Sequence, residues 1–186
     1  QYVAEARAMG VEVLPPHVNE SGHRFTVVGE TIRFGLSAVK NVGGNFVEAV
    51  IAAREKSGPF EDLFELCERV DCKTYNKRTI ESLIKCGAFD SMGYSRAALL
   101  KVHEKAVEIA QKGSKDANDA QFCMFDAAEL APPKPTFPEV EQDKRTDLEW
   151  EKETLGLYVS DHPLRPVLHK LKKHTDTTVS ELEGFR

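Results

Sequence analysis

Helical spacing of apolar residues, interrupted by short loops, dominates the chain between residues 36 and 109. In this stretch apolar side chains recur at the intervals of one face of an α-helix. The pattern breaks at 41–44, 57–59 and 86–89, where Gly, Pro or Asn occur. It predicts helices over 36–40, 46–56, 60–67 and 77–85, and a longer helix after residue 95. Asn76 and Ser95 are suitable N-terminal caps. The sequence therefore indicates a mainly α-helical unit.

The first 34 residues have a different pattern. Residues 2–9 are typical of a helix that ends at Gly10, and residues 11–16 lead through Pro15 and Pro16 as an extended segment. Residues 25–28 and 31–34 alternate like two short strands around a turn at Gly29 and Glu30. We expect a small β-hairpin before the helices.

Residues 113–147 have the composition of a linker, because Gly, Ser, Asp, Asn and Pro accumulate there. The acidic charge is also concentrated near this stretch. The chain carries a net charge of −5, yet residues 1–112 hold 15 basic and 15 acidic side chains. Helical spacing returns with Leu148. We therefore expect an N-terminal remnant at 1–34, a helical domain at 35–112, a linker at 113–147 and a helical segment at 148–186.

The composition excludes several classes of protein. A neutral 1–112 region argues against a strongly basic nucleic-acid binder that uses charge alone. There is no apolar run long enough to span a membrane, so we expect none. The four cysteines form no CxxC pair and the six histidines are scattered, so we expect no metal site. No arrangement of carboxylates or nucleophiles suggests a catalytic residue. The sequence begins without Met and stops abruptly, and we expect both ends to be cuts in a longer protein.

The segment 38–49 has the form of two helices joined by a tight hairpin. A phosphate oxygen can approach the backbone amides of such a hairpin at the N-terminus of its second helix. Gly43 suits close approach and a positive φ, and Asn41 tolerates the left-handed region. An ordinary helix connection with a Gly cap is the alternative. The candidate DNA-binding residues here are Lys40, Asn41, Val42, Gly43, Gly44 and Asn45.

A second, weaker copy of this pattern lies at 83–90 and leads to the helix after Ser95. Gly87 has no partner Gly two positions on, and Phe89 suits a packed core better than a surface loop. Two such hairpins would contact two phosphates of one duplex. The candidate residues are Lys85, Cys86, Gly87 and Ala88.

One apolar island interrupts the predicted linker, at residues 121–125. Exposed together, such side chains would be unfavourable unless they dock in a hydrophobic groove. The alternative is that they fold back onto their own domain. The candidate docking residues are Gln121, Phe122, Met124 and Phe125.

Four segments together resemble the alpha subunit of bacterial DNA polymerase III, a C-family replicative polymerase. Residues 32–43 resemble the end of the fingers and the entry to its helix-hairpin-helix region, and residues 14–21 a segment just before. The family usually has Asp at the position of His17. Residues 76–90 resemble the second hairpin, and residues 151–164 the lead into the family's OB-fold barrel.

The resemblance implies a non-catalytic segment of a DNA-directed DNA polymerase, a nucleotidyltransferase of chromosomal DNA replication. Its catalytic aspartates and Mg²⁺ would lie upstream, so this chain needs no cofactor and should be inactive alone. The tandem helix-hairpin-helix domain would bind double-stranded DNA through phosphates. Gln121, Met124 and Phe125 would match the internal motif for the beta sliding clamp, with Phe122 in its variable middle. The other holoenzyme subunits are further expected partners, and the expected location is the cytoplasm.

A purely structural connector between fingers and OB domain, with no DNA contact, remains the alternative. Salt-dependent duplex binding would separate the two, because phosphate contacts weaken as salt rises.

Overall fold

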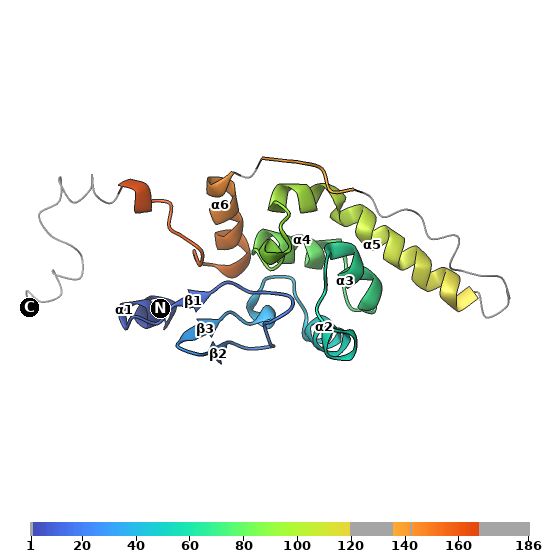
Figure 1. Ribbon diagram of the computed structural model, residues 1–186, viewed down its shortest axis with the longest axis horizontal. Coiled ribbons are helices and arrows are strands. Elements are labelled where there is room, and N and C mark those ends of the chain that lie inside the picture. The colour runs from blue at the N-terminus through green and yellow to red at the C-terminus, as the bar shows by residue number, and fades with distance from the viewer. Residues whose placement is uncertain (1, 120–135, 142, 168–186) are drawn as a thin grey trace, which may run out of the picture.

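The computed structural model describes residues 2–119, 136–141 and 143–167 (Figure 1). A short helix, α1 (Tyr2–Ala8), is followed by the strands β1 (Val13–Leu14), β2 (Thr26–Val28) and β3 (Thr31–Arg33). The helical part comprises α2 (Gly44–Ser57), α3 (Leu63–Arg69), α4 (Lys77–Lys85), α5 (Arg96–Asp119) and α6 (Lys144–Leu155). Three 3-10 turns, η1 (Leu36–Ala38), η2 (Asp90–Met92) and η5 (Arg165–Val167), complete the elements of these described ranges. The predicted mainly α-helical fold with a small β-hairpin is confirmed.

The small sheet has the strand order β1-β3-β2. β2 and β3 form the predicted hairpin, with Val28 opposite Thr31, and Gly29 turns the chain with φ 60°. β1 pairs with β3 in parallel, with Val13 opposite Ile32. The sequence indicated only an extended segment there. This third strand joins the N-terminal segment to the start of the helical part.

Local signals in the sequence account for the helix boundaries. The Asn76 side chain accepts a hydrogen bond from the Thr79 amide at the start of α4, and the Ser95 hydroxyl accepts one from the Ala98 amide at the start of α5. Asp62 is the cap of α3, and its side chain accepts a hydrogen bond from the Glu65 amide at 2.7 Å.

α5 is longer than the spacing predicted, and it continues through Gly113 to Asp119. A helix already nucleated by tertiary packing extends through weak formers at little cost per residue. Its first half packs on α3 and α4, and its second half extends away from them in Figure 1. At 24 residues it spans roughly 36 Å.

The His17 side chain accepts a hydrogen bond from the backbone two residues further on, as an Asp side chain often does in a turn. Its Nδ1 accepts the Asn19 amide at 3.1 Å, while its own carbonyl accepts the Ser21 amide at 2.8 Å. Burial lowers the pKa of His17, which favours the neutral ring that this acceptor role requires.

The small sheet and the helices share one hydrophobic core. It contains Val13 from β1, Phe34 just after β3, Phe46 from α2, Leu99 from α5 and Leu155 from α6. Because α6 contributes to this core, the segment after residue 143 is part of the same folded body as the helices before it.

A buried ion pair fixes the position of α6. Arg96 is 3% exposed and Glu151 is fully buried, and Arg96 Nη2 donates to Glu151 Oε1 at 3.0 Å. The other oxygen of Glu151 accepts the amides of Val159 and Ser160. Burial disfavours the charged guanidinium, but its contacts with Asp90 and Glu151 outweigh this effect and raise the pKa of Arg96.

Replacing Glu151 by Ala should destabilise the protein by about 3–5 kcal/mol, because the guanidinium of Arg96 would be left buried with one partner fewer. The free energy of unfolding in urea measures this loss. The exposed Glu153, two residues further on α6, is the matched control, and its removal should cost about 0.5 kcal/mol or less. Equal effects of the two substitutions would show that the buried pair does not anchor α6.

Candidate nucleic-acid interface

The first hairpin is presented at the surface. η1 ends at Ala38, Val39 enters the core, and the chain turns before α2 begins at Gly44. Of the six candidate residues here, five are exposed and Val42 is half-buried. The sequence predicts an accessible loop between two helical segments, and the backbone has that form.

The left-handed residue of this hairpin is Asn41, with φ 63°. Gly43 was expected to need a positive φ, but its φ is −83°, in extended backbone. A Cβ added at Gly43 would meet nothing within 4 Å. Gly43 therefore relieves no backbone strain. What Gly43 contributes is an exposed stretch of backbone, without a side chain, just before α2.

The N-terminus of α2 faces this open side of the hairpin. The first amide bonded within the helix is that of Val47, which donates to the Gly43 carbonyl at 3.2 Å. The amides of Gly44 and Asn45 precede it and so have no acceptor within the helix. Gly43 caps the helix without a side-chain hydrogen bond. Partial positive charge at this end favours an anion, and an anion could approach without meeting a side chain of residues 43 or 44.

The charges around the hairpin are mixed. Lys40 is exposed beside it, and the imidazole of His23 lies 3.9 Å from where a Cβ on Gly44 would stand. His23 Nε2 in turn lies 3.9 Å from a carboxylate oxygen of Glu48, one turn into α2. Electrostatic attraction at this point is therefore modest, as the neutral 1–112 region predicts.

Three hydrogen bonds from later elements hold the hairpin. The amide of Lys40 donates to the Thr154 carbonyl of α6 at 3.0 Å. The Asn41 side-chain amide donates to the Ser82 hydroxyl at 3.1 Å, and the Thr79 hydroxyl donates to the Asn41 carbonyl at 3.1 Å. Sequence patterns gave no signal for these partners, because Thr79 and Ser82 are small polar residues inside a predicted helix.

The second loop is covered. Cys86, Gly87 and Ala88 are buried, and Gly87 turns the chain with φ 81°. The guanidinium of Arg96 occupies the space that a Cβ on Gly87 would need, and it donates to the Lys85 carbonyl at 3.0 Å.

The side chain of Lys85 is also occupied. Its ammonium lies 2.9 Å from a carboxylate oxygen of Glu81 and 3.4 Å from one of Glu153. The backbone of this loop thus faces protein, which favours a packing role over a phosphate contact.

The predicted docking residues Gln121, Phe122, Met124 and Phe125 lie outside the described residues. The chain is described again from Thr136 and returns to the helical body at once. Phe137 stacks on Tyr94 with ring centres 3.9 Å apart, and the Ser95 hydroxyl donates to the Val140 carbonyl. The described residues therefore stop at the end of α5 and resume beside the start of α5.

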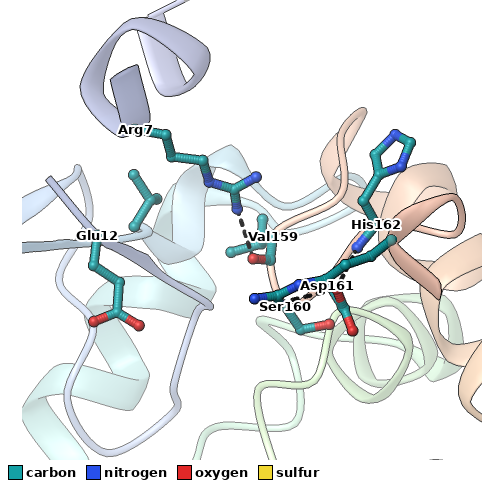
Figure 2. A pocket seen from close by; sticks show the side chains of 8 residues that line it. Arg7, Glu12, Val159, Ser160, Asp161 and His162 are labelled. Atoms are coloured by element: carbon teal, nitrogen blue, oxygen red, sulfur yellow. Dashed lines mark hydrogen bonds and ion pairs between the residues drawn. The ribbon is translucent and has the colours of Figure 1, made fainter. Parts of the chain in front are cut away.

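A shallow cleft lies between α1 and the chain that follows α6. Figure 2 shows Arg7 reaching across it, where its guanidinium donates to the Val159 carbonyl at 2.6 Å. Asp161 is held by Lys144, the His162 amide and Arg165, and these keep the pKa of its carboxyl well below its usual range. The Arg7 guanidinium and the Asp161 carboxylate of this cleft are thus already bound by other groups of the protein.

The described residues include no group of three or more His, Cys, Asp and Glu side chains suited to hold a metal ion. Burial raises the pKa of the Cys67 and Cys86 thiols to about 12, so neither is a thiolate at neutral pH. None of the helices in the described ranges has the length and apolarity that crossing a bilayer requires.

Comparison with known proteins agrees with this geometry. The family profile of the helix-hairpin-helix motif matches residues 10–99, which include the sheet, both loops, α2 to α4 and the start of α5. This part of the chain therefore has the character of a helix-hairpin-helix motif.

The relatives are more specific. The chain is 42% identical over 184 residues to DNA polymerase III subunit alpha of Mycobacterium tuberculosis, covering 96% of this chain and 16% of that protein. The Pasteurella multocida subunit is 42% identical over 188 residues, and that of Thermus aquaticus 41% over 185 residues, covering 16% and 15% of those proteins. The chain thus spans about a sixth of the length of the curated relatives that it matches. It corresponds to a segment of DNA polymerase III subunit alpha.

Proposed function

We propose that this chain is the part of a replicative DNA polymerase that binds newly made duplex DNA through its phosphates and connects the enzyme to a sliding clamp. The parent would be a DNA-directed DNA polymerase, as the relatives' name suggests, and we expect it in the cytoplasm. Its catalytic aspartates and Mg²⁺ would belong to another part of the parent. On its own, this chain would bind DNA but add no nucleotides.

The observation that carries the DNA proposal is the open hairpin at 41–45. Backbone amides at the start of α2 meet no covering side chain at Gly43, and Lys40 is exposed nearby. Contacts of this kind are made to the sugar–phosphate backbone and do not depend on base sequence. That property suits a polymerase, which must hold whatever duplex it has just made.

The near-neutral surface limits what charge can contribute. A binder that neutralises many phosphates loses affinity steeply with salt, whereas one with few cations depends more on geometry. With Lys40 and few other cations beside the hairpin, we expect a weak interaction with a shallow dependence on salt. In the whole polymerase this contact would add to others and would not act alone.

The clamp proposal depends on the island at 121–125 and on its setting. Gln121, Met124 and Phe125 resemble the family's internal clamp motif. The long α5 before this segment, and the Phe137 contact after it, support a segment anchored at both ends. Such anchoring would limit how far a bound clamp could lie from the DNA-binding hairpin.

Gly43→Leu should weaken binding of a mixed-sequence duplex about tenfold, since a side chain there would keep a phosphate from the amides of α2. Fluorescence anisotropy at low salt measures this affinity. The substitution removes a good N-cap, so the folded fraction is checked by thermal unfolding. Gly113→Leu is the control, because Gly113 also faces open space, on α5. Undiminished affinity in a folded Gly43→Leu protein would favour the structural-connector alternative.

Lys40→Ala should lower the slope of log affinity against log salt by about 0.9, the value for one lost phosphate contact. The backbone amide that binds Thr154 remains, so the hairpin should keep its shape. Lys56 in the last turn of α2 lies roughly 18 Å further along that helix and is the control. The same slope in wild type and Lys40→Ala would remove Lys40 from the interface.

Replacing Met124 and Phe125 together by Ala should abolish binding to the sliding clamp in surface plasmon resonance, because the two apolar side chains would supply the anchoring contacts. Duplex affinity should not change. Leu130→Ala, in the same segment but outside the island, is the control. A clamp affinity that survives the double substitution would contradict the docking role.

A further inference from the structure

We propose that Thr79 and Ser82 of α4 are positioning residues for the first hairpin, so that the second helix-hairpin-helix unit serves as its support. This inference rests on the proposed DNA contact, which it deepens by naming what holds the contacting loop in shape. In this arrangement the first hairpin presents its backbone to the phosphate, and the second unit holds that backbone in place.

The two hydroxyls are well placed for this role. Thr79 and Ser82 are three residues apart on α4 and so share a face of the helix. Each is 4% exposed. Thr79 donates to the main chain of Asn41, and Ser82 accepts from the side chain of the same residue. Asn41 is therefore held at both its carbonyl and its side-chain amide.

The backbone of Asn41 makes such support useful. Asparagine tolerates a φ of 63° better than most residues with a Cβ, but it still adopts this φ at a higher cost than glycine, and the neighbours offset that cost. Glycine would adopt the same φ freely but would offer no side chain to bind Ser82. Asparagine lacks that freedom, but its side chain forms a hydrogen bond with Ser82 of α4.

The third hydrogen bond that holds the hairpin comes from α6. The Lys40 amide is bound by the Thr154 carbonyl of α6, and α6 is held in turn by the pair of Glu151 and Arg96. In the described part of the chain, all three cross-element hydrogen bonds to residues 40 and 41 come from α4 and α6. The second loop is covered by Arg96, so its unit has a structural contribution to make without exposing its own backbone.

Thr79→Val tests the proposal on the full 186-residue chain. It removes the hydroxyl, and with it a longer contact of 3.4 Å to Asn76 Oδ1, but keeps the shape and the Thr79 amide that binds the Asn76 cap. Losing one such hydrogen bond should lower the population of the binding-competent loop and weaken duplex affinity about three- to tenfold. Hydrogen exchange at the amides of Lys40 and Val42, which donate to the carbonyls of Thr154 and Val39, should become faster by a similar factor without DNA.

Rescue and control variants separate positioning from general stability. Thr79→Ser restores a hydroxyl and should return both affinity and exchange close to wild type. Ser82→Ala, which removes the acceptor of the Asn41 side chain, should resemble Thr79→Val. Thr74→Val removes a hydroxyl that bonds only the Asp71 carbonyl, in the turn before α4, and should change neither measurement.

The outcomes distinguish this inference from the proposed function. If Gly43→Leu weakens binding but Thr79→Val leaves affinity and exchange unchanged, the hairpin contacts DNA without support from α4 and the inference is overturned. If Thr79→Val accelerates exchange at the Lys40 and Val42 amides while Gly43→Leu leaves duplex affinity unchanged, α4 does position the loop, and it is the DNA contact that fails. Equal acceleration of exchange across the whole protein would also contradict a specific positioning role.

Discussion

The ion pair between Arg96 and Glu151 is the contact on which the arrangement of α5 and α6 depends. Two charges taken from water are costly to bury unless further hydrogen bonds satisfy them. Here Arg96 also binds Asp90 and the carbonyls of Lys85 and Asp147, and Glu151 binds two backbone amides. A single residue therefore joins the end of α4, the start of α5 and α6. Hydrophobic packing alone would leave the rotation of α6 on this surface less defined.

The same ion pair makes the two hairpins different. By lying over Gly87, Arg96 converts the second loop from a surface feature into part of the interior. By holding α6, it also places the Thr154 carbonyl where it binds the first hairpin. Two loops of related sequence pattern thus differ in exposure. The loop at 41–45 lies at the surface, and the loop at 86–88 is buried. One side chain at the start of α5 thus covers the second loop, whose Gly87 is left-handed, whereas the glycine of the first hairpin is extended and open.

Local chemistry was readable from the sequence, and distant pairing was not. The caps Asn76 and Ser95, the turn at Gly29 and the left-handed tolerance of Asn41 each depend on a few neighbouring residues, and each was predictable. The partners Arg96 and Glu151 are 55 residues apart, and charged residues usually indicate a solvated surface. Gly43 shows the limit of a residue-type rule, since the glycine that suits a positive φ has an extended backbone here. The placement of a duplex against 41–45 stays a prediction.

A neutral domain that holds DNA must obtain its affinity from shape more than from charge, and shape requires rigidity. A loop that samples several conformations reduces its apparent affinity in proportion to the time spent away from the competent one. For a strongly basic surface this matters little, because many phosphate contacts can compensate for one another. For a hairpin with one exposed lysine beside it, each tether at Asn41 and Lys40 bears directly on binding. The buried network behind the hairpin is therefore best understood as the means by which a weakly charged protein can make a defined contact with a uniform backbone.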